Sequence, residues 1–339
     1  MIAIDYKALK SALATPCKIA IIPHRNPDGD AIGSTLALCH YLRKIGHEAV
    51  VVSPNEAPSF LHWMPGFETI LNFENHRDLA LKTLEQASFV FTLDFNHLSR
   101  VGHDMQPNLE RLKTTFVMID HHQQPDTYAK YTYSDTEICA TCQMVYHFIE
   151  DMGDLHLIDK DIANCLYTGI LTDTGSFKFA STTATTHKVA AALIDKGAQN
   201  ASIHLAIYDT NSPSRLHLLG CALKNMEILP EFHTAIIHLS QAELDQFDYK
   251  KGDTEGLVNY GLSIEGIVFA VIFIENAAEK IVKISFRSQG SFSVNEFARA
   301  HFNGGGHDNA AGGRGEDSLE NTITYFKSIL PKYKNQLDK

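Results

Sequence analysis

The sequence predicts an α/β fold, a mostly parallel sheet with helices on both faces, followed by a smaller α+β domain. Through the first half of the chain, short apolar runs alternate with stretches of helical period, which is typical of β-α-β units. After about residue 186 the pattern changes to strand-like segments that lead into a glycine-rich stretch. A length of 339 residues is sufficient for two such domains.

The elements expected in the first domain follow in a regular order. Residues 18–23 read as a buried strand, and after a loop residues 32–45 have helical period, with Gly46 as the C-cap. Further strands are expected at 49–52, 89–93 and 115–119, and further helices at 79–85, 139–151 and 158–171. The loops after residues 23, 93 and 119 should then lie at the carboxyl edge of the sheet, where such folds bind their ligands.

The second domain is expected to begin after a connecting region. A helix is predicted at 186–196, and the polar segment 209–214 reads as a connection. Beyond it we expect strands at 234–238, 267–274 and 283–287, a helix at 294–300 and a glycine-rich turn at 303–313. The resulting division is a first domain at 1–190, a helix end and linker at 191–215, and a second domain at 216–339.

Composition excludes several classes of protein. The chain has 29 Lys and Arg against 40 Asp and Glu, a net charge of −11, so it lacks the basic surface that a binder of long duplex nucleic acid needs; a short anionic ligand stays compatible. No apolar run approaches the roughly 18 to 20 residues that span a bilayer, and the first 20 residues lack the apolar core of a secretory signal. We expect a cytoplasmic protein without membrane contact. Its oligomeric state stays open, a homodimer included.

Cysteine usage agrees with a reducing compartment. Six cysteines are too few for a disulfide scaffold. The spacing Cys139-Ala-Thr-Cys142 is compatible with half of a zinc site, but a second pair is missing, so helix packing is the favoured interpretation.

The loop after the first strand carries a histidine and two carboxylates within seven residues. It reads His24-Arg-Asn-Pro-Asp28-Gly-Asp30 and opens into a helix. This mixture of nitrogen and oxygen donors suits a divalent metal such as Mn²⁺. The alternative is that the two aspartates only cap the helix.

The next two strand ends favour the metal. One strand ends in Asp94 and the following strand in Asp120-His121-His122, while Asp173 closes a helical segment before a glycine turn. Packing alone does not explain why three strands in succession deliver Asp or His to the same sheet edge.

Two ions fit these groups better than one. The donors exceed what a single ion needs from protein, and ion pairs about 3.5 to 4 Å apart are a recurrent feature of phosphoesterases. A carboxylate shared between the ions would fix their spacing, and hydrolysis of a phosphate ester is the natural chemistry. The candidate ligands are His24, Asp28, Asp30, Asp94, His121 and Asp173.

These segments resemble the motifs of the DHH family of phosphoesterases, named for the run present here as Asp120-His121-His122. The stretch Gly304-Gly-Gly-His307-Asp-Asn-Ala-Ala-Gly312 resembles the substrate motif of the associated DHHA1 domain. The resemblance spans most of the chain and keeps the motif order. In length and domain order the chain is similar to the bacterial oligoribonucleases (nanoRNases) of this family that also dephosphorylate 3′-phosphoadenosine 5′-phosphate (pAp).

The resemblance implies roles for individual residues. His24, Asp28 and Asp94 would hold one Mn²⁺, and Asp94 would bridge to a second. The ligands of that second ion would be Asp30, Asp94, His121 and Asp173. His122 would face the scissile phosphate. Asp120 would not bind a metal itself but would orient a metal ligand through a hydrogen bond. The DHHA1-type domain would grip substrate through Arg287, Ser288, Gly305, Gly306 and His307.

Other interpretations stay open for the weaker candidates. Three consecutive glycines also form flexible turns, and only the neighbouring Arg287 and His307 favour a phosphate-binding loop. Arg100 and His103, soon after Asp94, could contact phosphate or a base, or could belong to a solvated helix start.

The expected function is Mn²⁺-dependent hydrolysis of short oligoribonucleotides to mononucleotides and of pAp to AMP. The main rival is a phosphodiesterase for cyclic di-AMP or linear dinucleotides, which the sequence does not exclude. The long single-strand exonucleases of the superfamily fit less well, because they are longer and carry an additional nucleic-acid domain, and because the second half here is acidic. An inorganic pyrophosphatase shares the metal motifs, but its second domain lacks the glycine-rich motif. A non-enzymatic nucleotide sensor would require a lost ligand, and all the ligands are present.

Overall fold

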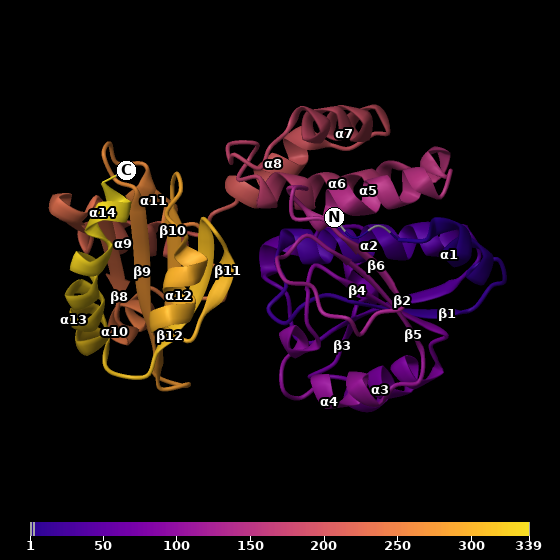
Figure 1. Ribbon diagram of the computed structural model, residues 1–339, viewed down its shortest axis with the longest axis horizontal. Coiled ribbons are helices and arrows are strands. Elements are labelled where there is room, and N and C mark those ends of the chain that lie inside the picture. Colours follow the sequence, from indigo (N-terminus) through magenta and orange to yellow (C-terminus); the bar gives the residue numbers. More distant parts are fainter. Residues whose placement is uncertain (1, 3, 339) are drawn as a thin grey trace. The chain divides into compact units, whose positions relative to one another are not determined.

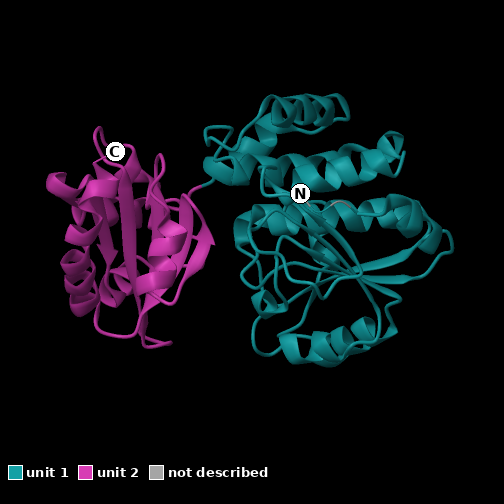
Figure 2. Cartoon of the chain, in the orientation of Figure 1, with its two compact units in different colours: residues 1–210 teal, residues 211–339 magenta. Residues whose placement is uncertain are grey.

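The chain divides into two compact units, residues 1–210 and residues 211–339 (Figure 2). The computed structural model describes residue 2 and residues 4–338. The boundary falls between helix α8 (Asn200–Tyr208) and helix α9 (Pro213–Lys224). Both helices overlap the segment 191–215 that was expected as a helix end and linker, so most of that segment is helical.

The first unit contains a sheet of six parallel strands in the order β3-β2-β1-β4-β5-β6. The order reverses between β1 and β4, which are neighbours in the sheet although two strands separate them in sequence. In open parallel sheets such a switch point leaves a crevice at the carboxyl ends of the strands. The strands are β1 (Lys18–Ile22), β2 (Glu48–Ser53), β3 (Leu71–Asn72), β4 (Phe89–Leu93), β5 (Thr115–Asp120) and β6 (Tyr131–Ser134).

Helices cover both faces of this sheet (Figure 1). On one face lie α1 (Tyr6–Ala12), α2 (Gly29–Lys44), α5 (Thr141–Asp151) and α6 (Lys160–Asp173), with α7 (Ala184–Asp195) and α8 packed on α6. On the other lie α3 (Arg77–Gln86) and α4 (Gln106–Arg111). Because successive side chains of a strand point to opposite faces, β1 supplies alternate residues to two cores: Ile19 and Ile21 to the first, Ala20 and Ile22 to the second. The expected α/β class is confirmed.

The second unit is built on a mixed sheet in the order β11-β12-β10-β9-β8-β7. Only β8 and β9 are parallel. The strands are β7 (Glu227–Leu229), β8 (Thr234–Leu239), β9 (Phe269–Asn276), β10 (Ile281–Ser288), β11 (Gly305–His307) and β12 (Ala310–Gly315). The helices are α9, α10 (Gln241–Gln246), α11 (Asn259–Leu262), α12 (Val294–His301), α13 (Leu319–Ile329) and α14 (Lys334–Leu337).

An aromatic core lies between this second sheet and helices α12 and α13. Phe269 and Phe286 of the sheet contact Phe297 of α12 at ring-centroid distances of 5.3 and 5.6 Å. A second, aliphatic core lies under α9, α10 and α11. The sheet is therefore buried on both faces near β8 and β9.

Two differences from the expectations have physical causes. Residues 303–313, expected as a turn, form the hairpin β11–β12, because backbone pairing does not require the side chains that glycine lacks. The helix expected from residue 139 begins at Thr141, and its start is held by a group outside the helix, as described below. Within the described residues, no helix is both long and apolar enough to cross a membrane.

Candidate metal centre

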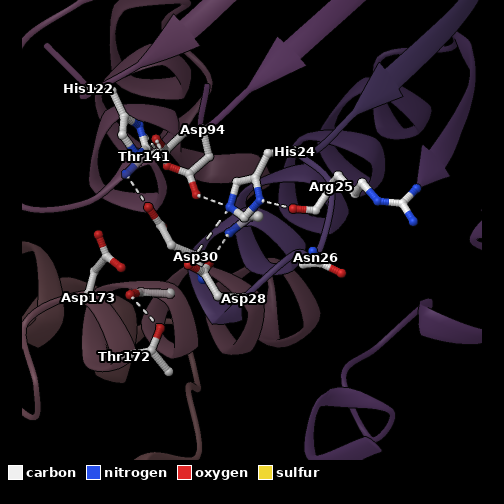
Figure 3. Close-up of polar contacts among 12 residues, drawn as sticks. His24, Arg25, Asn26, Asp28, Asp30, Asp94, His122, Thr141, Thr172 and Asp173 are labelled. Atoms are coloured by element: carbon white, nitrogen blue, oxygen red, sulfur yellow. Dashed lines mark hydrogen bonds and ion pairs between the residues drawn. The ribbon is translucent and has the colours of Figure 1, made fainter. Parts of the chain in front are cut away.

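The switch point between β1 and β4 brings the candidate ligands together at one edge of the sheet. His24 follows β1, Asp94 follows β4, and His121 follows β5. All three residues are buried, with at most 6% of the surface of each residue exposed. Helix α2 begins beside them, so Asp28 and Asp30 reach the same region (Figure 3).

Asp28 serves the helix and the site at the same time. Its Oδ1 accepts hydrogen bonds from the backbone N–H groups of Asp30 and Ala31, at 3.0 and 3.1 Å, which caps helix α2. Its Oδ2 lies 3.8 Å from Nε2 of His24. Capping and metal binding are thus compatible interpretations of this residue, because each uses a different oxygen.

Asp94 lies between two groups of potential ligands. Its Oδ2 is 3.5 Å from Nε2 of His24, and its Oδ1 is 3.4 Å from Nε2 of His121. One group is His24, Asp28 and Asp94, the other is Asp30, Asp94 and His121, and the ligand atoms of each lie within 4.8 Å of one another. Asp94 also has a left-handed backbone (φ +65°), which is costly for a residue with a side chain and is found mainly where surrounding structure imposes it.

Asp173, the last residue of α6, extends the second group. Its Oδ2 lies 3.3 Å from Nε2 of His121, and its side chain is partly exposed. A close approach of α6 to α2 brings it there. A Cβ atom on Gly169 would lie 2.6 Å from Oδ1 of Asp30, and one on Gly33 would lie 2.5 Å from the carbonyl oxygen of Cys165. Any larger residue at these two positions would separate the helices and displace the carboxylates.

The buried carboxylates and imidazoles of the site shift one another's pKa. Burial, and then the nearby charge of Asp94, raise the pKa of Asp30 to about 7. Burial opposes ionisation of Asp94, but hydrogen bonds from His121 and His24 outweigh it and hold the Asp94 pKa well below its usual range. The pKa of His121 is correspondingly raised by Asp94 and Asp173, against the effect of burial.

A divalent cation fits this donor set. Four carboxylates converge on two imidazoles, and, against the effect of burial, the nearby carboxylates raise the pKa of both His24 and His121. Neutral imidazole nitrogens and carboxylate oxygens are donors suited to Mn²⁺ and related ions, and a cation bound here would replace protons on these groups.

His122 is held by Asp120. Its Nδ1 lies 2.7 Å from Oδ1 of Asp120 and 3.7 Å from Oδ1 of Asp94. Asp120 is fully buried, and within the part of the chain that the structure describes its Oδ2 has no hydrogen-bond partner. The contact between His122 and Asp120 is made through Nδ1, and it fixes the orientation of the His122 ring.

In the second unit, strand pairing aligns Arg287 with the hairpin. Arg287 of β10 pairs with Ala310 of β12, and Ala310 pairs with His307 of β11, so Arg287 and His307 occupy one row across three strands. Gly306 in the hairpin donates its N–H to Asn295 of α12 at 3.1 Å, and a Cβ atom on Gly305 would lie 3.7 Å from the guanidinium carbon of Arg299.

Ser288 is arranged differently from Arg287. It is buried, donates to the carbonyl oxygen of Phe292 at 2.6 Å and accepts from the Asn309 side chain at 2.9 Å. These contacts tie the end of β10 to the following loop. Its hydroxyl hydrogen is already used within the unit.

Arg100 lies near the metal centre, and His103 lies farther along the loop. The carbonyl oxygen of Arg100 accepts from the N–H of Arg25 at 2.8 Å, and the charge of Arg100 disfavours protonation of His24. Both Arg100 and His103 are exposed. Arg100 therefore has the charge and the proximity for phosphate, whereas His103 is placed on the surface.

Two positioning contacts escape detection in the sequence. Asn26, also left-handed (φ +55°), exchanges two hydrogen bonds with Asn55 at 2.7 and 2.9 Å, which joins the loops after β1 and β2. Thr141 donates its hydroxyl to Asp94. One feature of the sequence could have indicated the contacts of Thr141. Ala140, which precedes α5, has no side-chain oxygen to accept hydrogen bonds from the first backbone N–H groups of the helix, so that acceptor must come from another part of the chain.

The two cysteines of the Cys139–Cys142 spacing take no part in a ligand group. Cys139 donates to the side chain of Gln143 at 3.1 Å, and Cys142 contacts the carbonyl oxygen of Asp30 at 3.6 Å. No group of close metal-ligand atoms among the described residues includes a cysteine. The packing interpretation agrees with these contacts.

Comparison with known proteins finds relatives over both units. Residues 18–170 match the DHH family, N-terminal domain, and residues 233–332 match the DHHA1 domain. The chain is 34% identical over 298 residues to the bifunctional oligoribonuclease and PAP phosphatase NrnA of Thermus thermophilus, which covers 87% of this chain and 83% of the relative. The protein of the same name from Bacillus subtilis is 29% identical, over 86% of this chain and 88% of the relative.

A solved structure is also similar over nearly the whole length. The exopolyphosphatase-related protein from Bacteroides fragilis matches with a TM-score of 0.94 and 38% identity, covering 98% of this chain and 97% of that one.

Proposed function

Because the chain belongs to the DHH family and carries a DHHA1 domain, as its motifs indicated, we propose that it is a Mn²⁺-dependent phosphoesterase. The proposed reactions are the degradation of short oligoribonucleotides to mononucleotides and the removal of the 3′-phosphate of pAp. The names of the relatives from Thermus thermophilus and Bacillus subtilis support this pair of activities.

The observation that carries the proposal is the position of Asp94. Its two oxygens face two separate ligand groups, one with His24 and one with His121. A single buried carboxylate in this position can serve both groups. Two divalent cations, when bound, supply a water of lowered pKa as nucleophile and neutralise the charge of the phosphoryl oxygens.

The chain's own residues divide the remaining work. His24 and Asp28 complete the first group, and Asp30, His121 and Asp173 complete the second. His122, held through Nδ1 by Asp120, would use Nε2 to donate a hydrogen bond to a phosphoryl oxygen or a proton to the leaving oxygen.

In the second unit, Arg287 and His307 would recognise a substrate phosphate. A guanidinium group matches two phosphate oxygens at once, and the imidazole lies in the same row of the sheet. The net charge of −11 makes a long polyanion an unfavourable substrate. Short nucleotides, which few cationic groups can hold, fit the site better.

One assay tests the proposal directly. Purified protein with Mn²⁺ is given dinucleotides, longer RNAs up to 24 nucleotides, pAp and cyclic di-AMP, and kcat/KM is compared. We expect the highest values for RNAs of two to five nucleotides and for pAp, and no turnover with excess EDTA. Preference for cyclic di-AMP would favour the rival phosphodiesterase activity, and binding of nucleotides without turnover would favour a sensor.

A further inference from the structure

Helix α5 begins with three hydrogen bonds to carboxylates of the candidate metal centre. The N–H of Thr141 donates to Oδ2 of Asp30 at 2.6 Å, and the N–H of Cys142 donates to Oδ1 of Asp30 at 2.8 Å. The hydroxyl of Thr141 donates to Oδ1 of Asp94 at 3.0 Å (Figure 3). Asp30 thus replaces the missing cap of the helix, and in return both of its oxygens are fixed.

These contacts serve one ligand group only. Oδ1 of Asp94, which accepts from Thr141, is the oxygen that faces His121, whereas Oδ2 faces His24. Asp30 belongs to the group that contains His121. All three hydrogen bonds from the start of α5 therefore end in the Asp30–Asp94–His121 group.

Burial makes the Thr141 hydroxyl hard to replace. Thr141 and Asp30 have no exposed surface, and Asp94 is 2% exposed. Water cannot readily take the place of a lost donor in so closed a position, so Oδ1 of Asp94 would lose a hydrogen bond that fixes its direction.

We propose that Thr141 is a positioning residue for one of two metal sites, the one formed by Asp30, Asp94 and His121. Its hydroxyl fixes the direction of Oδ1 of Asp94, and its N–H fixes Oδ2 of Asp30. Removal of the hydroxyl weakens binding at this site and spares the site of His24 and Asp28. The inference rests on the two-ion site of the proposed function and goes beyond it by making the two ions unequal.

The test is a Mn²⁺ titration of the metal-free full-length chain. At each step, electron paramagnetic resonance measures the concentration of unbound Mn²⁺. Thr141→Val keeps the shape of the side chain and removes the hydroxyl, while Thr141→Ser retains the hydroxyl. Thr83→Val is the matched control, because it makes the same change on helix α3, where the hydroxyl donates to the carbonyl oxygen of Leu79 and touches none of the candidate ligands.

We expect the wild-type chain to bind two ions. In Thr141→Val one ion should bind about 10- to 100-fold more weakly and the other within about 3-fold of wild type. Thr141→Ser and Thr83→Val should keep both affinities, and excess Mn²⁺ should restore kcat of Thr141→Val. If the valine variant does not fold, Thr141→Ala removes the same hydroxyl with a smaller side chain.

Equal weakening of both ions, or no weakening in any folded variant without the hydroxyl, would overturn the inference and leave the proposed function intact. A wild-type chain that binds fewer than two ions yet retains activity would remove the two-ion site, and this inference with it. Absence of both binding and hydrolysis in the wild type would instead count against the proposed function itself.

Discussion

The two units hold their charged groups in opposite ways. In the first, Asp30 and Asp94 are buried and Asp28 is partly exposed, and backbone amides at the starts of α2 and α5 hold Asp28 and Asp30. In the second, Glu243 is surrounded by neutral donors, and Arg287 lies half-buried on β10, between β12 and β9. The first arrangement costs stability unless a cation is added, and the second does not. We infer that chemistry belongs to the first unit and recognition to the second.

The largest expected effect comes from the residue shared by both ligand groups. Asp94→Asn keeps the shape of the side chain and removes the charge, so both ions should bind more weakly. We expect kcat/KM for pAp to fall by at least about 10²- to 10³-fold. Asp195→Asn, which changes an exposed aspartate on α7, is the control. More than about a tenth of the activity remaining at saturating Mn²⁺ would show that Asp94 is not shared.

Two adjacent histidines should separate metal binding from catalysis. His121→Ala removes a member of a ligand group and should lower the Mn²⁺ content of the purified chain. His122→Ala should leave two ions per chain and lower kcat, by about 10²-fold if the ring transfers a proton. Elemental analysis and steady-state kinetics of both variants give the answer, and equal metal loss in the two would contradict the assignment.

Arg287→Ala tests whether recognition belongs to the second unit. Loss of charged hydrogen bonds worth about 1.5 to 3 kcal/mol should lower kcat/KM for pAp and dinucleotides by about 10- to 100-fold. The metal content should change far less. The same holds for hydrolysis of bis-p-nitrophenyl phosphate, a small substrate with few groups that the second unit could bind. Lys283→Ala, on the same strand and paired with Glu279, is the control. An equal loss on both substrates would mean that Arg287 helps to assemble the catalytic site.

Removal of metal should destabilise the first unit selectively. Without a cation, the mutual repulsion of the buried carboxylates remains and adds to the cost of their burial. Hydrogen exchange with and without EDTA should therefore show faster exchange in residues 18–170 and little change in residues 233–332. Uniform acceleration across both segments would show that the ions act on the whole chain.

The smallest expected effect concerns Glu243, the carboxylate with neutral partners. Burial opposes its ionisation, but hydrogen bonds from Asn225 and Ser240 prevail and lower its pKa to about 2. Because this lies below the unfolded value of about 4.3, the charge stabilises the fold above about pH 4.3, and the contribution is lost as the pH falls through about 2.

Glu243→Gln should consequently cost about 1 kcal/mol at pH 7, a figure reduced for the partial exposure of the group. The cost should shrink toward pH 2 to 3, as urea denaturation at the two pH values would show. A cost that does not depend on pH would mean that shape, and not charge, sets the contribution of this residue.

Much of the fold could be predicted because its signals are local. The apolar runs of β1, β4 and β5 and the helical period of α2 and α6 identify these elements. Strands β3 and β6 were not predicted, since β3 has two residues and β6 is a short polar segment. The hairpin β11–β12 was interpreted as a turn because glycine carries no side-chain pattern.

The candidate ligands could likewise be named from the sequence, because each follows a strand, begins a helix or, in the case of Asp173, ends one. The groups that hold the ligands could not. Thr141 lies 47 residues from Asp94 and 111 residues from Asp30 in the chain, and no local rule relates them. The sequence also could not show that Ser288 is arranged differently from Arg287. The hydrogen-bond partners of Ser288 come from the following loop and from the hairpin.

The sequence by itself determined which residues are candidates for the chemistry: it places histidines and aspartates at strand ends that a parallel sheet must align. Only the tertiary structure decided how they are used. It assigned one oxygen of Asp28 to the helix and the other to the site, and it turned the two oxygens of Asp94 toward different histidines. The physical reason is that donor type follows from local sequence, whereas the direction of a buried carboxylate is set by hydrogen bonds from whatever the fold packs against it.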